Sequence, residues 1–219
     1  MIKRAKKPWP TKDVMQQVYE MKLWGGKDFD FYSGNGSHHS KIIKPYLDGI
    51  ISFLSSYNNS LIVCDLGCGD FNIGKQLTKY TRQYIAIDIV EKLIDRNKTL
   101  FKENNLEFHC LDITEDELPK GDCIILRQVL QHLSNAEIQK IIKKLSPYKY
   151  VILSEHIPTG NFIPNKDIIS GQGIRLKQNS GVNLLEPPIN LKVIEETNFK
   201  DIRLENNQGR IATTIYKCF

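Results

Sequence analysis

Three aspartates in this 219-residue chain stand where short apolar runs end. Asp65 lies in LIVCDL, Asp88 ends YIAID, and Asp112 ends LEFHCLD. Carboxylates accept hydrogen bonds from hydroxyl and amine groups, and they attract cations. If the three runs are parallel strands, their carboxyl ends share one edge of a sheet, and the aspartates would surround one ligand there.

Two glycines follow the first aspartate, in the stretch Gly67-Cys68-Gly69. Glycine permits a tight turn and lets the backbone approach a ligand closely. A dinucleotide site would require a third glycine in the pattern G-x-G-x-x-G, but Asn72 occupies that position. A carboxylate at Asp70 would also repel a pyrophosphate. The pattern therefore favours a ligand without phosphate groups.

The elements that must position these residues alternate between helices and strands, which predicts an α/β fold with a parallel sheet. The predicted strands are 61–66, 84–88, 106–112, 122–127 and 150–155, and the predicted helices between them are 72–80, 91–103 and 135–145. Two helices precede the sheet, the first capped by Thr11. A helix over 188–197 and an antiparallel pair, 199–207 and 210–219, close the chain. We expect the helix starting near Asn72 to point its amides at the ligand.

We interpret residues 1–219 as one domain with four parts: a helical cap (1–57), a ligand-binding core (58–155), a lid (156–190) and a C-terminal strand pair (191–219). The segment 156–190 lacks helical or strand periodicity but is too apolar for a disordered tail. Long irregular segments in compact domains commonly cover a binding site. We therefore expect an ordered lid over the substrate.

The net charge of +5 comes from the N-terminus, where Lys3, Arg4, Lys6, Lys7 and Lys12 stand without an acid among them. The remaining chain has 25 basic and 25 acidic residues, so its body is neutral. This argues against an extended nucleic-acid surface, although the basic arm could contact phosphate.

The five cysteines are scattered and show no paired metal-ligand spacing, so we expect no metal site and a reducing cytoplasmic location. No apolar stretch approaches the roughly 20 residues that a membrane span needs, and no apolar segment of a secretory signal follows the basic N-terminus. The sequence gives no indication of the oligomeric state.

Three segments in order, VCDLGCGD, AIDIV and LDI, resemble the motifs of the class I S-adenosylmethionine-dependent methyltransferases. The resemblance covers roughly 61–155. It implies a Rossmann-like three-layer sandwich with a seven-stranded, mostly parallel sheet, an antiparallel last strand and, here, an N-terminal helical extension. It also implies that S-adenosyl-L-methionine, which carries a sulfonium and no phosphate, is the cofactor.

This resemblance implies roles for the residues after the first two strands. Asp65 would accept hydrogen bonds near the methionine part of the cofactor. Gly67, Cys68 and Gly69 would line it with backbone. Asp88 would bind both ribose hydroxyls, which suits the two oxygens of a carboxylate.

Residues after the second to fourth strands complete the implied cofactor site. Ile89 would pack on the adenine, and Asp112 with the Ile113 amide would face the adenine amine. Arg127 and Gln128 directly follow the fourth strand and are candidates to contact cofactor or substrate.

Three residues are candidates for a general base, which an oxygen acceptor can require. His132 lies one turn beyond the fourth strand, and the phrase VLQHL resembles one in many family members where the histidine is often structural. Glu155 and His156 end the fifth strand in SEHIP, where a carboxylate next to an imidazole could act as a base.

The lid and the N-terminal loop supply further candidates. Asp167, Arg175 and Asn183 could hold a polar substrate. The loop YSGNGS, which precedes His38 and His39, could fold over the methionine end of the cofactor. Adjacent histidines on a helix point apart, so a metal site at this pair is disfavoured.

The segments EHIP and GIRLKQNSGVNLL resemble a subgroup of small bacterial methyltransferases associated with surface polysaccharides or small metabolites. The resemblance implies O-methylation of a small polar or sugar-like acceptor, with a small molecule or glycan as the partner. Two alternatives stay open. One is an RNA or protein methyltransferase anchored by the basic arm, and the other is a non-catalytic cofactor-binding protein.

Overall fold

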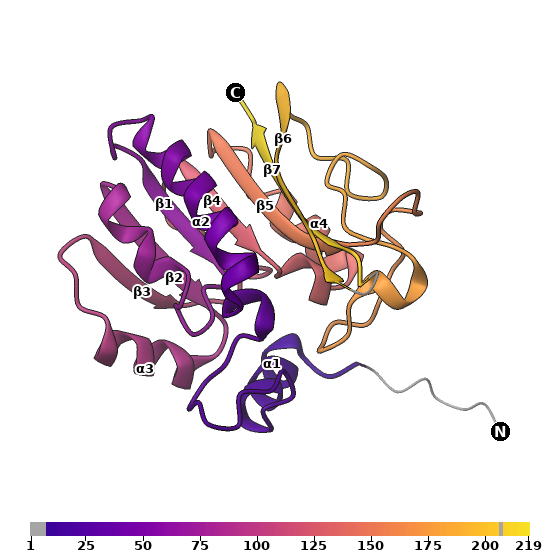
Figure 1. Ribbon diagram of the computed structural model, residues 1–219, viewed down its shortest axis with the longest axis horizontal. Helices are drawn as coiled ribbons and strands as arrows, with labels where there is room; N and C mark the ends of the chain where they lie inside the picture. The colour runs from indigo at the N-terminus through magenta and orange to yellow at the C-terminus, as the bar shows by residue number, and fades with distance from the viewer. Residues whose placement is uncertain (1–7, 206–207) are drawn as a thin grey trace.

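Seven strands form one sheet in the computed structural model, which describes residues 8–205 and 208–219 (Figure 1). Four of the five basic residues of the N-terminal arm lie outside the described residues. The spatial order of the strands is β3-β2-β1-β4-β5-β7-β6. The strands are β1 (Ile62–Leu66), β2 (Gln83–Asp88), β3 (Leu106–Cys110), β4 (Cys123–Arg127), β5 (Tyr150–Ile157), β6 (Glu195–Arg203) and β7 (Arg210–Lys217).

Strands β1 to β5 are parallel neighbours, and β7 runs antiparallel between β5 and β6. The predicted fold class is confirmed, including the antiparallel last strand. The chain order reverses between β1 and β4, which is the switch point where open parallel sheets bind ligands.

Four α-helices and five short 3₁₀ turns accompany the sheet in the described residues. The helices are α1 (Thr11–Glu20), α2 (Ser40–Ser55), α3 (Glu91–Leu100) and α4 (Asn135–Ile142). The 3₁₀ turns are Asn35–Ser37, Gly74–Gln76, Thr78–Tyr80, Leu130–His132 and Arg175–Gln178. Thr11 is the first residue of α1 rather than its cap, a position that Pro10 occupies.

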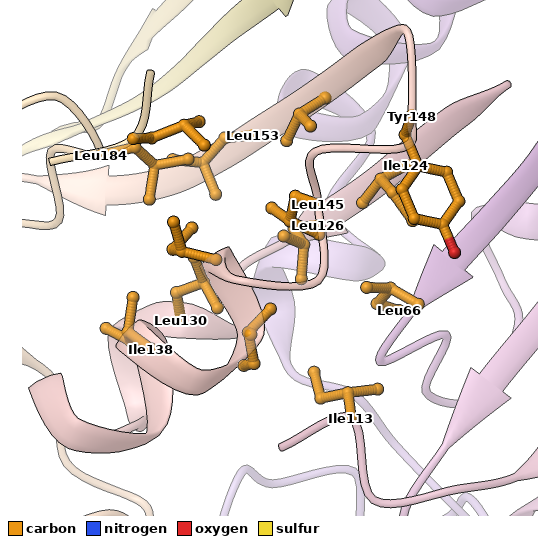
Figure 2. Packing of buried hydrophobic residues seen from close by; sticks show 14 of the residues in the cluster. Leu66, Ile113, Ile124, Leu126, Leu130, Ile138, Leu145, Tyr148, Leu153 and Leu184 are labelled. Atoms are coloured by element: carbon orange, nitrogen blue, oxygen red, sulfur yellow. The ribbon is translucent and has the colours of Figure 1, made fainter. Parts of the chain in front are cut away.

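The two faces of the sheet bury different clusters because successive strand side chains point to opposite faces. Along β4, Cys123 and Ile125 join the cluster under α2, whereas Ile124 and Leu126 join the cluster under α4. Figure 2 shows the second cluster, in which Leu126 lies among aliphatic side chains of β1, β5 and α4. Because both faces of these strands are buried, the sequence has nearly continuous hydrophobic runs.

The predicted helix over 72–80 is wrong, since two 3₁₀ turns occupy this stretch. Gly74 lies directly against the ring of Phe71, so a side chain there would collide with the ring. Thr78 and Thr81 bond the backbone locally, with the Thr81 hydroxyl donating to the Thr78 carbonyl at 2.7 Å. Such bonds compete with helix formation. The expected helix N-terminus at Asn72 is therefore absent from the ligand edge.

The predicted helix over 188–197 is also wrong. Its last residues, from Glu195, form the start of β6, paired with β7. Pairing with the complementary edge of β7 outweighs the helical spacing of the side chains, and the Ile194 amide already donates to the Lys217 carbonyl at 2.9 Å.

The irregular segment after β5 replaces a covering helix on the α4 side of the sheet. Val182, Leu184, Ile189 and Leu191 are each buried in the same cluster as α4. This burial explains why the segment is ordered without regular secondary structure.

We predict that Leu126→Ala lowers the free energy of unfolding by about 2–5 kcal/mol, because it removes a fully buried side chain from a packed core. Urea denaturation followed by circular dichroism measures the change. The control is Leu100→Ala at the end of α3, where the leucine is 57% exposed and a change near zero is expected. Equal losses in the two variants would contradict the described packing.

Candidate functional site

A cavity of about 370 Å³ lies at the carboxyl ends of β1, β2, β3 and β4. Ten of the residues predicted from the sequence line it: Gly67, Cys68, Gly69, Asp88, Ile89, Asp112, Ile113, Arg127, Gln128 and His132. Asp65, Glu155, His156, Asp167, Arg175 and Asn183 do not line it.

The glycine turn after β1 forms the floor of the cavity. Gly67 and Gly69 have φ angles of 82° and 57°, in the left-handed region that favours glycine. The amides of Gly67 and Cys68 both donate to the Ile87 carbonyl, at 2.8 and 2.9 Å. A side chain at Gly67 would collide with Val129, and one at Gly69 with Ser33. Both positions therefore require glycine for conformation and for space.

Asp88 joins the turns that follow β1 and β2. One carboxylate oxygen accepts the Gly69 amide at 3.0 Å and the other accepts the Val90 amide at 3.1 Å. Burial raises the pKa of Asp88, and the backbone hydrogen bonds oppose that rise by stabilising the ionised form. Because an ionised carboxylate has about four acceptor sites, Asp88 retains acceptor capacity toward the cavity that it lines.

The other two aspartates lie differently. Asp65 is buried behind the cavity wall, where its carboxylate accepts the Tyr84 hydroxyl at 2.8 Å. Burial raises the pKa of Asp65 to about 7. Asp112 lines the cavity while its carboxylate accepts the amide and hydroxyl of Thr114, at 2.8 and 2.7 Å.

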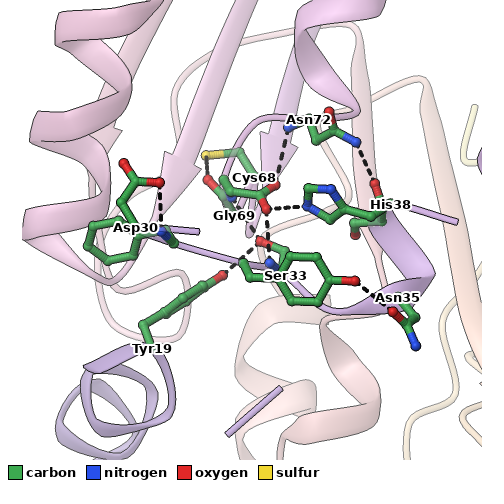
Figure 3. A network of polar contacts seen from close by, with 12 residues as sticks. Tyr19, Asp30, Ser33, Asn35, His38, Cys68, Gly69 and Asn72 are labelled. Atoms are coloured by element: carbon green, nitrogen blue, oxygen red, sulfur yellow. Dashed lines mark hydrogen bonds and ion pairs between the residues drawn. The ribbon is translucent and has the colours of Figure 1, made fainter. Parts of the chain in front are cut away.

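A polar network built on Asp70 fixes the loop before α2 over the glycine turn (Figure 3). The Asp70 carboxylate accepts the Ser33 amide at 2.9 Å and contacts the His38 ring at 2.5 Å. In return, the Ser33 hydroxyl accepts the Asp70 amide at 2.8 Å and bonds the Tyr19 hydroxyl at 3.1 Å. Asp70 thus organises the loop.

Arg127 holds the same loop from β4. Its guanidinium donates to the Gly36 carbonyl at 2.5 Å and to the Ser37 hydroxyl at 3.0 Å, and it stacks over the Tyr46 ring. Its cationic head is therefore already committed to the loop.

Gln128, which follows Arg127, has a strained backbone and a side-chain amide without a described hydrogen-bond partner. It has a φ of 57°, which costs a non-glycine residue about 1–2 kcal/mol. Its side-chain Nε2 is buried and has no hydrogen-bond partner among the described residues. An unpaired buried amide costs about 1–3 kcal/mol. Both features lie at the cavity wall.

The roof of the cavity comes from α1 and from the segment after β5. Met15, Tyr19 and Trp24 line the cavity from one side, and Gln172 and Ile174 line it from the other. The Gln172 side chain donates to the Leu23 carbonyl at 2.8 Å, which joins the two parts.

Glu137 on α4 ties the roof to the sheet. Its carboxylate accepts the hydroxyls of Thr11, Ser134 and Ser170, and it completes the capping box of α4 with Ser134. Three segments distant in the sequence therefore meet at one carboxylate.

His132 lines the cavity as a packed imidazole. Its Nδ1 lies 3.1 Å from the Gly171 carbonyl and its Nε2 lies 3.3 Å from the Gln131 amide nitrogen. The Gln131 amide oxygen accepts the His156 backbone amide at 3.0 Å, which orients the amide nitrogen toward His132. Burial lowers the pKa of His132 to about 4, so the ring is neutral at pH 7. This geometry favours a structural role.

Glu155 and Arg175 are interior supports of the segment Leu130–Asn135. The two Glu155 oxygens accept the amides of Leu130 and Gln131, each at 3.0 Å. Arg175 is 1% exposed and donates to the carbonyls of 130, 131, 133 and 166 and to the Asn135 side chain. With its donors used inside the protein, Arg175 does not reach the cavity.

Of the remaining predicted residues, two hydrogen-bond the backbone and one lies beside a neighbouring cavity. Asp167 accepts the Asn135 amide at 2.8 Å at the start of α4, and Asn183 stabilises a turn through Leu185. His156 lies beside a neighbouring cavity, and its Nε2 is 2.5 Å from the Gln208 carbonyl. His39 lines that neighbouring cavity as well.

Sequence reasoning missed Tyr19, Trp24, Gln131 and Gln172. They come from the roof and the turn after β4, and no motif singles them out. Within 8–205 and 208–219, no cluster of three metal-ligating side chains occurs. No helix in the same ranges is long and apolar enough to cross a membrane.

The residues that line the cavity fit a cationic, phosphate-free cofactor. Asp88 and Asp112 supply carboxylates, no lysine is among the described lining residues, and the Arg127 head is turned to the loop. The two glycines leave the space that side chains would fill. The cavity can therefore hold a sulfonium nucleoside.

The strand order, together with the glycine turn and the aspartates at the carboxyl ends of the strands, is that of the class I S-adenosylmethionine-dependent methyltransferase fold. Residues 63–147 match a family model described as a methyltransferase domain. The chain thus contains a methyltransferase domain and has the class I fold, and the cofactor of this class is S-adenosylmethionine.

Two solved structures share the fold at low identity. They are the magnesium protoporphyrin IX methyltransferase of Synechocystis PCC 6803 with bound SAM (TM-score 0.60, 16% identity, 97% of this chain and 99% of that one) and the N-methyltransferase NodS of Bradyrhizobium japonicum WM9 with S-adenosylhomocysteine (TM-score 0.64, 12% identity, 94% and 98%).

Among curated relatives, the ubiquinone biosynthesis O-methyltransferase of Rickettsia akari is 29% identical over 140 residues, which are 60% of this chain and 54% of that protein. The chain spans about half the length of this relative. Both O- and N-methyltransferases occur among the similar proteins.

We predict that Glu155→Gln flattens the pH dependence of stability. Burial raises the pKa of Glu155 from 4.5 to about 8. Its contribution to stability is therefore complete below about pH 4.5 and is lost as the pH rises through about 8, because the unfolded chain releases the proton first. Thermal melts between pH 5 and pH 8 should decline more steeply in the wild type.

Glu155→Gln also weakens the hydrogen bonds to Leu130 and Gln131. A melting temperature that is lower by the same amount at every pH therefore does not bear on the prediction. Parallel melting curves across that pH range would contradict the prediction. The control is Glu103→Gln at an exposed position, which should leave the wild-type slope unchanged.

Proposed function

We propose that the protein transfers a methyl group from S-adenosylmethionine to a small polar acceptor, with an oxygen acceptor preferred. The observation that carries the proposal is the cavity at the sheet edge, where the Gly67–Gly69 turn meets the Asp88 carboxylate. The bound cofactors named for the two structures of similar fold support it.

The proposed cofactor contacts follow from the lining residues. Asp88 would accept the ribose hydroxyls with its remaining acceptor sites, and Ile89 would pack on the adenine beside Asp112 and Ile113. Gly67, Cys68 and Gly69 would face the cofactor with backbone. Asp65 would support the rim from behind the cavity wall, where its carboxyl group accepts the Tyr84 hydroxyl.

When bound, the cofactor would supply a methyl group activated by a positively charged sulfur. The acceptor's lone pair would bond the methyl carbon, and the carbon–sulfur bond would break with its electrons going to sulfur. The chain's task is then mainly alignment and exclusion of water. Tyr19, Trp24 and Gln172 enclose the site, and the Asp70 network fixes the loop of Ser33 to Ser37.

Of the three candidate bases, His156 is best placed to take a proton from a hydroxyl acceptor. Glu155 and His132 are engaged on both heteroatoms, whereas the described residues provide a hydrogen bond only to Nε2 of the His156 ring. Burial lowers the pKa of His156, so its Nδ1 carries a lone pair at neutral pH.

We predict that Asp88→Ala weakens S-adenosylmethionine binding about tenfold or more, since hydrogen bonds to a charged group contribute about 1.5–3 kcal/mol. Isothermal titration calorimetry measures the dissociation constant. Because Asp88 also holds Gly69 and Val90, near-ultraviolet circular dichroism must first show a folded variant.

Glu103→Ala, which removes an exposed acid near the end of α3, is the matched control and should bind like the wild type. If a folded Asp88→Ala bound the cofactor as tightly as this control, the proposed cofactor site would be refuted.

A further inference from the structure

A second cavity, of about 340 Å³, lies beside the cofactor cavity. The start of α2, the end of β5, the end of β6 and the start of β7 surround it. Three residues, Asn35, Gly36 and Gln128, line both cavities. The wall between the two cavities therefore consists of Gln128 and the loop that Arg127 holds.

The charges of the second cavity are opposite to those of the first. Its cations are Lys41 and Arg203, and Glu205 is the acid among its described lining residues; the imidazoles of His39 and His156 also line it. The cofactor cavity instead presents Asp88 and Asp112. An anion is therefore attracted to the second cavity and repelled from the first.

The two cations of the second cavity are available to a ligand. Lys41 pairs with Glu205 at 2.9 Å, but both side chains are more than 70% exposed, so this pair contributes little. Arg203 makes no side-chain hydrogen bond or ion pair with the residues that the structure describes. An anionic group could engage both without disrupting the interior.

The first turn of α2 adds to the positive potential. His39 and Lys41 belong to this turn, the cap side chain makes no hydrogen bond, and the turn contains no acid. The amides at the start of a 16-residue helix carry partial positive charge, and His39, Lys41 and Ile42 of this helix start line the cavity.

The wall between the cavities contains the buried Gln128 amide without a described partner. The backbone holds it in the left-handed conformation, with the Gln128 amide N–H donating to the Ser154 carbonyl at 2.6 Å. Strain and an unused donor together are typical of functional sites. Gln128 lines both cavities, so it lies where they adjoin.

We propose that the second cavity binds the methyl acceptor, and that this acceptor is a small molecule with an anionic carboxylate or phosphate group held by Lys41 and Arg203. This inference rests on the proposed function. A hydroxyl acceptor would bond the methyl carbon as the carbon–sulfur bond of the cofactor breaks, the sulfur would leave as a neutral thioether, and the hydroxyl proton would pass to Nδ1 of His156.

The first experiment measures anion binding to the full chain without cofactor. Inorganic phosphate and, separately, acetate are titrated at constant ionic strength, and the melting temperature is followed by differential scanning fluorimetry. We expect Lys41→Gln/Arg203→Gln to weaken binding of the preferred anion about tenfold. The anion that binds more tightly identifies the group as phosphate or carboxylate.

The matched control is Lys44→Gln/Lys200→Gln, which removes the same charge from α2 and β6 at exposed positions outside the cavity. Equal anion affinity in the two double variants would overturn the anion site. S-adenosylmethionine affinity, measured by calorimetry, should match the wild type in both. Failure of the wild type to bind S-adenosylmethionine would instead refute the proposed function, whatever the phosphate result.

The second experiment identifies the acceptor class. Small molecules from a cell extract are separated on an anion-exchange resin, and each fraction is incubated with the protein and methyl-labelled S-adenosylmethionine. We expect labelled product from the retained fractions, reduced about tenfold in the cavity double variant and unchanged in the control. Labelled product from the unretained fractions alone would overturn the proposal.

Discussion

The structure of the site depends on the hydrogen bonds of one buried carboxylate. Asp88 accepts the Gly69 amide and the Val90 amide, so the turn after β1 and the turn after β2 are held in one arrangement. The Ile87 carbonyl, one residue earlier, accepts the other two amides of the glycine turn. Every further contact at the rim, including the loop on Asp70, is built on this joined floor.

In the proposed function, two cavities of opposite charge would hold the two reactants on either side of one wall. Arg127 holds this wall, because both terminal nitrogens of its guanidinium donate to the loop. A cationic cofactor and an anionic acceptor each have one favourable position, and the strained Gln128 lies between them. Electrostatics thus complements the steric fit of a small polar acceptor.

The core of the fold could be predicted because its signals are local: apolar strands, glycines at a turn and an acid at each strand end. The same signals found Gly67, Gly69 and Asp88. The helix over 72–80 failed because the packing of Gly74 on Phe71 is a tertiary effect. Arg175 looked like a substrate contact because sequence does not reveal that its donors would meet buried carbonyls. Tyr19 and Gln172 could not be found because only the folded chain brings them to the cavity.

The roof has a consequence for how the protein is made. The Gln172 side chain and the Leu23 carbonyl are 149 residues apart in the chain, and the Thr11 contact with Glu137 spans 126. During synthesis the floor around the glycine turn can form long before residue 172 leaves the ribosome. The contacts that enclose the site can therefore form only after residue 172 has been synthesised.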